Sequence, residues 1–225
     1  MSHAVVTALQ DVLLFVIADP FAVMNTIGLV AFALVGSSKA IREEFDLFGV
    51  LIVGLAMAFA GGVTRDLLVT RVPLALQSPV EIALGALGVL LAIALQFVLR
   101  SPDEHPITLV ADAIGLAAFA TTGAIVATEA GISPFGVVAI ATINAVGGGA
   151  FADILLDRSP FILFDDFYAS CAVLGGTAYF TMNFVGAAGS TAAAACAVVT
   201  VVTRLLAVTQ DWDLPTVQGL GLLKR

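Results

Sequence analysis

Two short stretches of the chain combine glycines with an aspartate inside apolar sequence. "AGGVTRD" spans Ala60–Asp66 and "GGGAFAD" spans Gly147–Asp153. A carboxylate at the centre of a membrane costs at least about 2.5–3.5 kcal/mol on insertion scales, so each aspartate is expected to face protein or water. Glycine weakens a helix by about 1 kcal/mol relative to alanine and permits bending or unwinding. Free helix carbonyls and a carboxylate both attract positive charge, which favours a route for cations.

Close helix packing is the alternative explanation, because glycine also lets neighbouring membrane helices approach each other. The route is favoured because an acid follows both clusters at the same spacing. Arg65 precedes Asp66, whereas the equivalent position in the second stretch is Ala152. Arg65 either narrows the route or forms a structural ion pair or a contact with the membrane interface. The predicted kink residues are Gly61, Gly62, Gly147, Gly148 and Gly149.

Other polar residues inside apolar stretches are candidates for the same route. Asn25 and Asp112 each stand two residues before an "IG" motif. Asp112 lies too far past Pro106 to cap a helix, so a cavity-facing position is favoured for this pair. Ser and Thr in membrane helices usually bond back to their own helix and are weaker candidates. The complete predicted pathway set is Arg65, Asp66, Asp153, Asn25, Asp112, Thr64, Ser37, Thr121, Thr122 and Asn144.

Composition identifies the environment in which these residues must work. The chain has 225 residues, of which 60% are hydrophobic and 12% are charged, and its mean hydropathy is +1.08. Apolar runs of about 20 residues recur along it, as in proteins that span membranes. The net charge of −8 argues against a nucleic-acid partner and weakly favours cations.

Enzyme chemistry is not expected from this sequence. His3 and His105 lie outside the predicted spans, and Cys171 and Cys196 show no ligand spacing with them. We therefore expect no intramembrane enzyme, no metal site and no cofactor. The two cysteines are interpreted as packing groups rather than as a disulfide.

The fold class expected is an all-α integral membrane protein with seven spans in one domain, 1–225. Residues 4–18 form either an extension of the first span or an interfacial segment. Proline and capping signals place the helix starts. The spans are predicted at 20–41, 48–70, 79–99, 107–129, 134–157, 166–186 and 189–208.

An internal repeat organises these spans. "IGLVAFALVG" at Ile27–Gly36 matches "IGLAAFATTG" at Ile114–Gly123, and a constant separation of 87 residues also aligns the two glycine–aspartate stretches. Units 20–99 and 107–186 each contain three spans, and an odd number inverts the second unit in the membrane. The architecture expected is therefore a three-plus-three inverted repeat plus a seventh span, 189–208, an arrangement shared by many transport proteins.

Basic residues predict the orientation. Most of them gather on one side of the seven-span topology, which the positive-inside rule assigns to the cytoplasm, whereas Arg71 falls on the other side, with Arg65 near that side. The N-terminus is then outside and the C-terminus is cytoplasmic, in a cell inner (plasma) membrane. The residues on the cytoplasmic side are Lys39, Arg42, Arg100, Arg158, Arg204, Lys224 and Arg225. Lys39 has no basic counterpart at Val126 and is interpreted as marking the interface.

These motifs resemble the trimeric intracellular cation channel (TRIC) family, in particular its prokaryotic members, which are also labelled glycine transporters. The similarity covers residues 24–217 and includes both "IG" openings, both glycine–aspartate stretches and the closing "VTRLLAVTQDWDLPTV". The family usually has GGG-x-x-RD in both repeats and an acid in the first opening motif. This chain departs from that pattern at Ala60, Ala152 and Asn25.

The resemblance implies a homotrimer of seven-helix protomers, each with its own potassium-permeable pore. It implies a pore lined by the first, second, fourth and fifth spans and shaped by glycine kinks. K⁺ or Na⁺ is the expected permeant ion, and membrane lipids are expected partners. The sequence contains no filter motif of repeated carbonyls, so only moderate selectivity is expected. A secondary transporter for a small solute such as glycine is the alternative, because inverted repeats also occur there.

Overall fold

The computed structural model describes residues 19–98, 106–163, 167–212 and 214. The segment 4–18, expected to be a helix extension or an interfacial segment, lies outside the described residues. Within the described part, seven α-helices and two short 3₁₀ helices account for the regular structure. Their bounds are α2 Pro20–Arg42, α3 Leu47–Leu68, η1 Leu74–Leu76, α4 Pro79–Val98, α5 Pro106–Glu129, α6 Pro134–Leu155, η2 Phe161–Leu163, α7 Tyr168–Phe184 and α8 Gly189–Thr209.

Helix starts follow the capping signals in the sequence. The Asp19 carboxylate accepts a hydrogen bond from the Ala22 N–H at 2.9 Å, and Pro20 occupies the first turn of α2. Ser133 caps α6 in the same way, followed by Pro134. Proline fits this position because it lacks an N–H that the first turn would leave unpaired.

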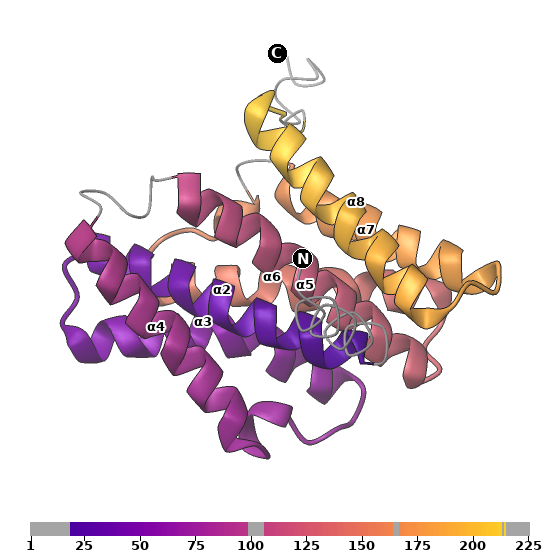
Figure 1. The fold of residues 1–225 in the computed structure, drawn as a ribbon, viewed down its shortest axis with the longest axis horizontal. Helices are drawn as coiled ribbons and strands as arrows, with labels where there is room; N and C mark the ends of the chain where they lie inside the picture. Colours follow the sequence, from indigo (N-terminus) through magenta and orange to yellow (C-terminus); the bar gives the residue numbers. More distant parts are fainter. Residues whose placement is uncertain (1–18, 99–105, 164–166, 213, 215–225) are drawn as a thin grey trace, which may run out of the picture.

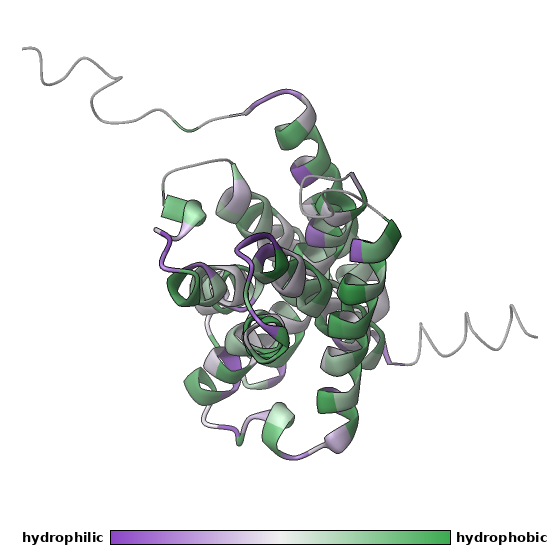
Figure 2. Ribbon diagram, turned by 90° about the vertical axis from the view of Figure 1, so that its left-hand side faces the viewer, coloured by the Kyte–Doolittle hydropathy of each residue, from purple (hydrophilic) through white to green (hydrophobic). Residues whose placement is uncertain are grey.

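Six of the seven described helices are long and apolar enough to cross a membrane. The exception is α7, which has 17 residues and packs along α8. Figure 2 shows hydrophobic residues along all the helices, with hydrophilic residues concentrated at helix ends and connections. The seven-helix, all-α architecture predicted from the sequence is confirmed.

Four helices form the centre of the bundle. α2 packs against α3 and α5, and α6 packs against the same two helices, which closes a ring of four. α4 covers α2 on one side, whereas α7 and α8 lie together on the opposite side against α5 and α6 (Figure 1). The residues expected to act together therefore come from the four central helices.

Close contacts show that the two three-helix units run in opposite directions. A side chain at Gly28 of α2 would meet the Phe119 ring of α5, and one at Gly115 would meet the Phe32 ring. As the residue number rises on one helix it falls on the other, so α2 and α5 are antiparallel. α3 and α6 cross in the same way. This is the packing required by an inverted repeat.

The glycines of α3 and α6 make this second crossing close. A Cβ at Gly61 would lie 2.1 Å from the Asn144 carbonyl oxygen, and one at Gly148 would lie 2.0 Å from the Met57 carbonyl oxygen. Glycine is therefore required at both positions because any side chain would strike the backbone of the partner helix.

This observation corrects one expectation. Both helices continue through their glycines, so the unwound segment with unpaired carbonyls proposed from the sequence is wrong. The close-packing explanation accounts for Gly61 and Gly148. A bend that keeps the helical hydrogen bonds stays a prediction.

Candidate functional site

The first group of polar residues gathers where α3 ends and α2 begins, and is called here the α3-end cluster: Asn25, Arg65, Asp66 and Glu81. The Arg65 Nε donates to Asp66 Oδ1 at 2.8 Å, and the Arg65 Nη2 lies 2.8 Å from the same oxygen. The other Asp66 oxygen accepts from the Leu74 N–H at 2.9 Å. Asp66 therefore pairs with the Arg65 guanidinium and also accepts a hydrogen bond from the start of η1.

Adjacent residues pair here although neighbours on a helix do not normally face each other. Both lie in the last turn of α3, and the long Arg65 side chain returns along the helix end with its guanidinium 5.4 Å from the centre of the Phe21 ring. The structural ion pair is the interpretation that the geometry favours.

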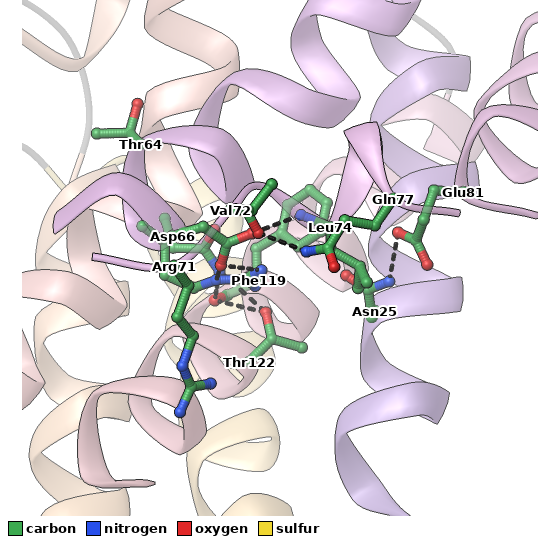
Figure 3. Close-up of polar contacts among 12 residues, drawn as sticks. Asn25, Thr64, Asp66, Arg71, Val72, Leu74, Gln77, Glu81, Phe119 and Thr122 are labelled. Atoms are coloured by element: carbon green, nitrogen blue, oxygen red, sulfur yellow. Dashed lines mark hydrogen bonds and ion pairs between the residues drawn. The ribbon is translucent and has the colours of Figure 1, made fainter. Parts of the chain in front are cut away.

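Asn25 and Glu81 complete the cluster (Figure 3). The Asn25 amide donates to Glu81 Oε2 at 2.8 Å, which joins α2 to α4. A cavity of about 20 Å³ is bordered by these four residues and, among others, by Phe119. A second cavity of about 390 Å³ shares Arg65 and Asp66 with it. Carboxylates thus border the space entering from this end of the bundle.

The second group lies at the opposite end of α2 and is called the α6-end cluster: Lys39, Asp112, Asp153, Tyr168 and Arg204. The Lys39 ammonium lies 2.9 Å from Asp153 Oδ1 and 4.9 Å from the centre of the Phe161 ring. The other Asp153 oxygen accepts from the Phe161 N–H at 3.1 Å. Asp153 is therefore paired with the Lys39 ammonium and hydrogen-bonded to the start of η2, just as Asp66 is paired with Arg65 and hydrogen-bonded to the start of η1.

Asp112 occupies the second half of this cluster. The Tyr168 hydroxyl donates to Asp112 Oδ1 at 3.0 Å, and the Arg204 Nε lies 3.6 Å from Asp112 Oδ2. The Arg204 guanidinium also stacks 4.6 Å from the centre of the Tyr168 ring. A cavity of about 260 Å³ is bounded by Lys39, Asp112 and Arg204 together with apolar side chains.

The two clusters correspond under the internal repeat. Asn25 aligns with Asp112 and Glu81 aligns with Tyr168, and each aligned pair is hydrogen-bonded between the first and third helices of its unit. The acid lies on α4 in the first unit and on α5 in the second. The repeat therefore conserves the contact within this one chain while exchanging donor and acceptor.

Several predicted residues lie between the clusters, completely buried. The Asn144 amide donates to the Phe119 carbonyl at 2.5 Å and to the Thr122 hydroxyl at 2.9 Å. Thr121 bonds back to Ala117, and Ser37 donates to the Val50 carbonyl of α3. Asn144 and Ser37 thus connect helices, whereas Thr121 bonds within α5, and none of these side chains borders the three cavities described above.

The remaining predicted residues divide between packing and surface. Gly62 borders the small cavity, and a Cβ there would lie 3.8 Å or more from any other group. Gly147 faces Gly61, and Gly149 faces Phe161. Thr64 is exposed, bonds back to the Ala60 carbonyl and points away from the cluster in Figure 3. A pathway role for Thr64 stays a prediction.

Sequence reasoning did not single out four residues of the clusters for the site: Lys39, Glu81, Tyr168 and Arg204. An ionisable residue within a span is itself a functional signal, and this signal identifies Glu81 and Arg204. The alignment of Glu81 with Tyr168 identifies the tyrosine. The same signal applies to Lys39, which lies within the predicted span 20–41, although its place near the end of that span favours an interface role and its partner is 114 residues away.

Antiparallel three-helix units around buried charged clusters at both ends define a polytopic membrane protein of the inverted-repeat class. The sequence profile of the family described as "Glycine transporter" matches twice, at residues 22–97 and 109–183. The chain belongs to this duplicated membrane family, which includes the prokaryotic TRIC channels. The two matches coincide with the two halves of the repeat.

Curated relatives agree with this assignment. The chain is 37% identical to a UPF0126 membrane protein of Deinococcus radiodurans over 175 residues, covering 76% of this chain and 80% of the relative. It is 32% identical to the UPF0126 inner membrane protein YadS of Escherichia coli over 200 residues, covering 86% and 94%.

Solved structures show the same fold. A solved structure described as "Structural basis for conductance through TRIC cation channels" matches with a TM-score of 0.79 and 36% identity, covering 87% of this chain and 96% of that one. The TRIC orthologue from Rhodobacter sphaeroides has a TM-score of 0.77 and 28% identity, covering 86% and 100%.

Proposed function

We propose that the chain is a potassium-permeable channel for monovalent cations. The observation that carries this proposal is the position of the two charged clusters, each bordering a cavity at opposite ends of α2. Asn25 and Lys39 are separated by roughly 21 Å along that helix, at 1.5 Å per residue. In this proposal the cavities at the two ends belong to one route, which is closed between them.

The proposed route runs between α2, α3, α5 and α6. Residues of α2, α3 and α5 border the cavities at the α3 end, and residues of α2 and α5 border the cavity at the α6 end. α6 supplies Asp153, which neutralises Lys39 at the cavity of about 260 Å³. Gly62 leaves space in the small cavity. This supports the pore lining implied by the family resemblance.

Charge balance supports a cation as the permeant species. The Arg65 and Lys39 cations are each paired with an aspartate, so neither presents an uncompensated positive charge to the route. Glu81 adds a carboxylate whose described hydrogen-bond partner is the neutral Asn25 amide. Similarity to proteins described as TRIC cation channels points in the same direction.

Glycine transport is the second candidate, because the family description names it. One experiment separates the two. Purified protein in a planar bilayer should give unitary current steps in potassium chloride, and these steps should be unchanged by added glycine. Absence of steps together with saturable glycine uptake into proteoliposomes would favour the transporter.

Assembly and orientation belong to the same proposal. We propose a homotrimer in an inner membrane, with its N-terminus outside and its C-terminus in the cytoplasm. Native mass spectrometry in detergent should give three times the chain mass of 23.0 kDa. Protease protection of tags at each end in inside-out vesicles tests the orientation, and a C-terminal tag protected from protease would contradict it.

A further inference from the structure

The "IG" motif occurs in both halves of the repeat, and the proposed pathway residues give no reason for its glycine and phenylalanine. Each motif contains a glycine followed four residues later by a phenylalanine: Gly28 and Phe32 on α2, and Gly115 and Phe119 on α5. The Phe32 and Phe119 rings pack edge to face with their centres 5.1 Å apart. Both side chains are almost completely buried.

Each ring is seated on the glycine of the other motif. A Cβ at Gly115 would lie 2.3 Å from the Phe32 ring, and a Cβ at Gly28 would lie 2.6 Å from the Phe119 ring. No side chain larger than hydrogen fits at either glycine while the ring stays in place. The two motifs therefore form one interlocked unit across the α2–α5 interface.

This unit lies between the cavities. On α2, Leu29 borders the small cavity and Val35 borders the cavity at the other end, with Phe32 one turn from each. On α5, Asp112 borders the far cavity and Phe119 borders the small one. The closed section measures roughly 9–11 Å along either helix, at 1.5 Å per residue.

The described contacts of the two rings are with each other and with glycines, although the Asn144 amide donates to the Phe119 carbonyl beside them. Met57 and Leu116 are completely buried in the same core, and a Cβ at Gly148 of α6 would lie 3.4 Å from the Phe32 ring. A short apolar constriction excludes water and so blocks ions without any covalent or charged barrier. Widening or wetting this section would join the two cavities.

We propose that Phe32 and Phe119 form the gate of the conduction route, an inference that rests on the proposed channel function. In the closed state each ring sits on the glycine of the opposite motif. Opening moves the rings off these seats and hydrates the section between Leu29 and Val35. Ions then pass from the α3-end cluster to the α6-end cluster.

Single-channel recording of purified Phe32→Ala and Phe119→Ala tests the gate. Each variant should raise open probability about twofold to twelvefold, the range that corresponds to losing one aromatic pair. The matched control is Phe180→Ala on α7, because Phe180 packs against Phe184 away from both cavities. The open probability of this control should equal that of the wild type.

A second variant keeps the test decisive if the alanine variants do not fold. Phe119→Tyr preserves the ring and adds a hydroxyl to the apolar section, so it should also raise open probability. Wild-type steps with unchanged open probability in Phe119→Tyr and in every alanine variant that folds would overturn the gate and leave the channel intact. A silent wild type with conducting Phe variants would support both, whereas silence of every protein would reject the channel and the gate with it.

Discussion

The Lys39 ammonium lies 2.9 Å from the Asp153 carboxylate and so joins the last turn of α2 to the last turn of α6. These residues come from different halves of the repeat, and the position equivalent to Lys39 is Val126. The aspartate that the repeat duplicates therefore has a different cation in each half, Arg65 from its own helix and Lys39 from another. The two ends of the proposed route are similar in design and unequal in charge placement.

Replacing Asp153 with asparagine should lower cation conductance. The change leaves the Lys39 ammonium uncompensated beside the cavity, and a positive charge there repels cations. Conductance measured in planar bilayers checks the effect, with Asp157→Asn as control because Asp157 is exposed in the following turn. Equal conductance in Asp153→Asn and the wild type would return this carboxylate to a purely structural role.

Replacing Lys39 with methionine should increase the selectivity for cations over anions. The Asp153 carboxylate then lacks its cation, and the permeability ratio of potassium to chloride should rise. Lys39→Arg preserves the charge and is the control. Thermal unfolding of Lys39→Met, Asp153→Asn and the double variant should give a coupling free energy of about 0.5–3 kcal/mol, as for contacting residues. Strict additivity would show that the ion pair contributes nothing to stability.

Gly148→Ala should destabilise the protein by about 1–3 kcal/mol, the usual cost of overpacking. The added methyl group would lie 2.0 Å from the Met57 carbonyl oxygen and push α3 and α6 apart. Gly149→Ala is the matched control, because the nearest group to its Cβ is the Phe161 ring at 3.5 Å. Melting temperature in detergent measures both. Equal melting temperatures would contradict the close crossing.

Arg65→Gln should cost about 3–5 kcal/mol, because it leaves the buried Asp66 carboxylate without its cation. Arg65→Lys should recover only part of this loss, since lysine cannot place two nitrogens on one carboxylate oxygen or stack on Phe21 as the planar guanidinium does. Thermal unfolding gives the comparison. Full recovery by lysine would mean that charge alone, without the guanidinium geometry, stabilises this end of α3.

The helices could be predicted from the sequence because their signals are local. Apolar length, the Asp19-Pro20 and Ser133-Pro134 starts and the repeat of Gly28–Phe32 at Gly115–Phe119 all lie within one helix or one constant separation. Opposed direction of the two units follows from the odd number of spans in each. These features depend on no detail of how the helices pack.

The pairing of the charged residues could not be predicted in the same way. Lys39 and Asp153 meet only because α2 and α6 end at the same side of the bundle, and Arg204 reaches Asp112 from α8, outside the duplicated units. The glycines illustrate a second limit. Bending and close packing both require a missing side chain, so the glycines alone do not distinguish them. The repeated aspartate favours a route, and only the placed partner helix shows the close packing at Gly61 and Gly148.

The reversal potential under a potassium chloride gradient tests the central claim most directly. Purified wild-type protein in a planar bilayer should give unitary steps that reverse near the potassium equilibrium potential. Lys39, Arg65 and Arg204 beside the route are each paired with an aspartate, and Glu81 adds a further carboxylate. Reversal near the chloride equilibrium potential, or a bilayer that stays silent while glycine is taken up, would contradict the account.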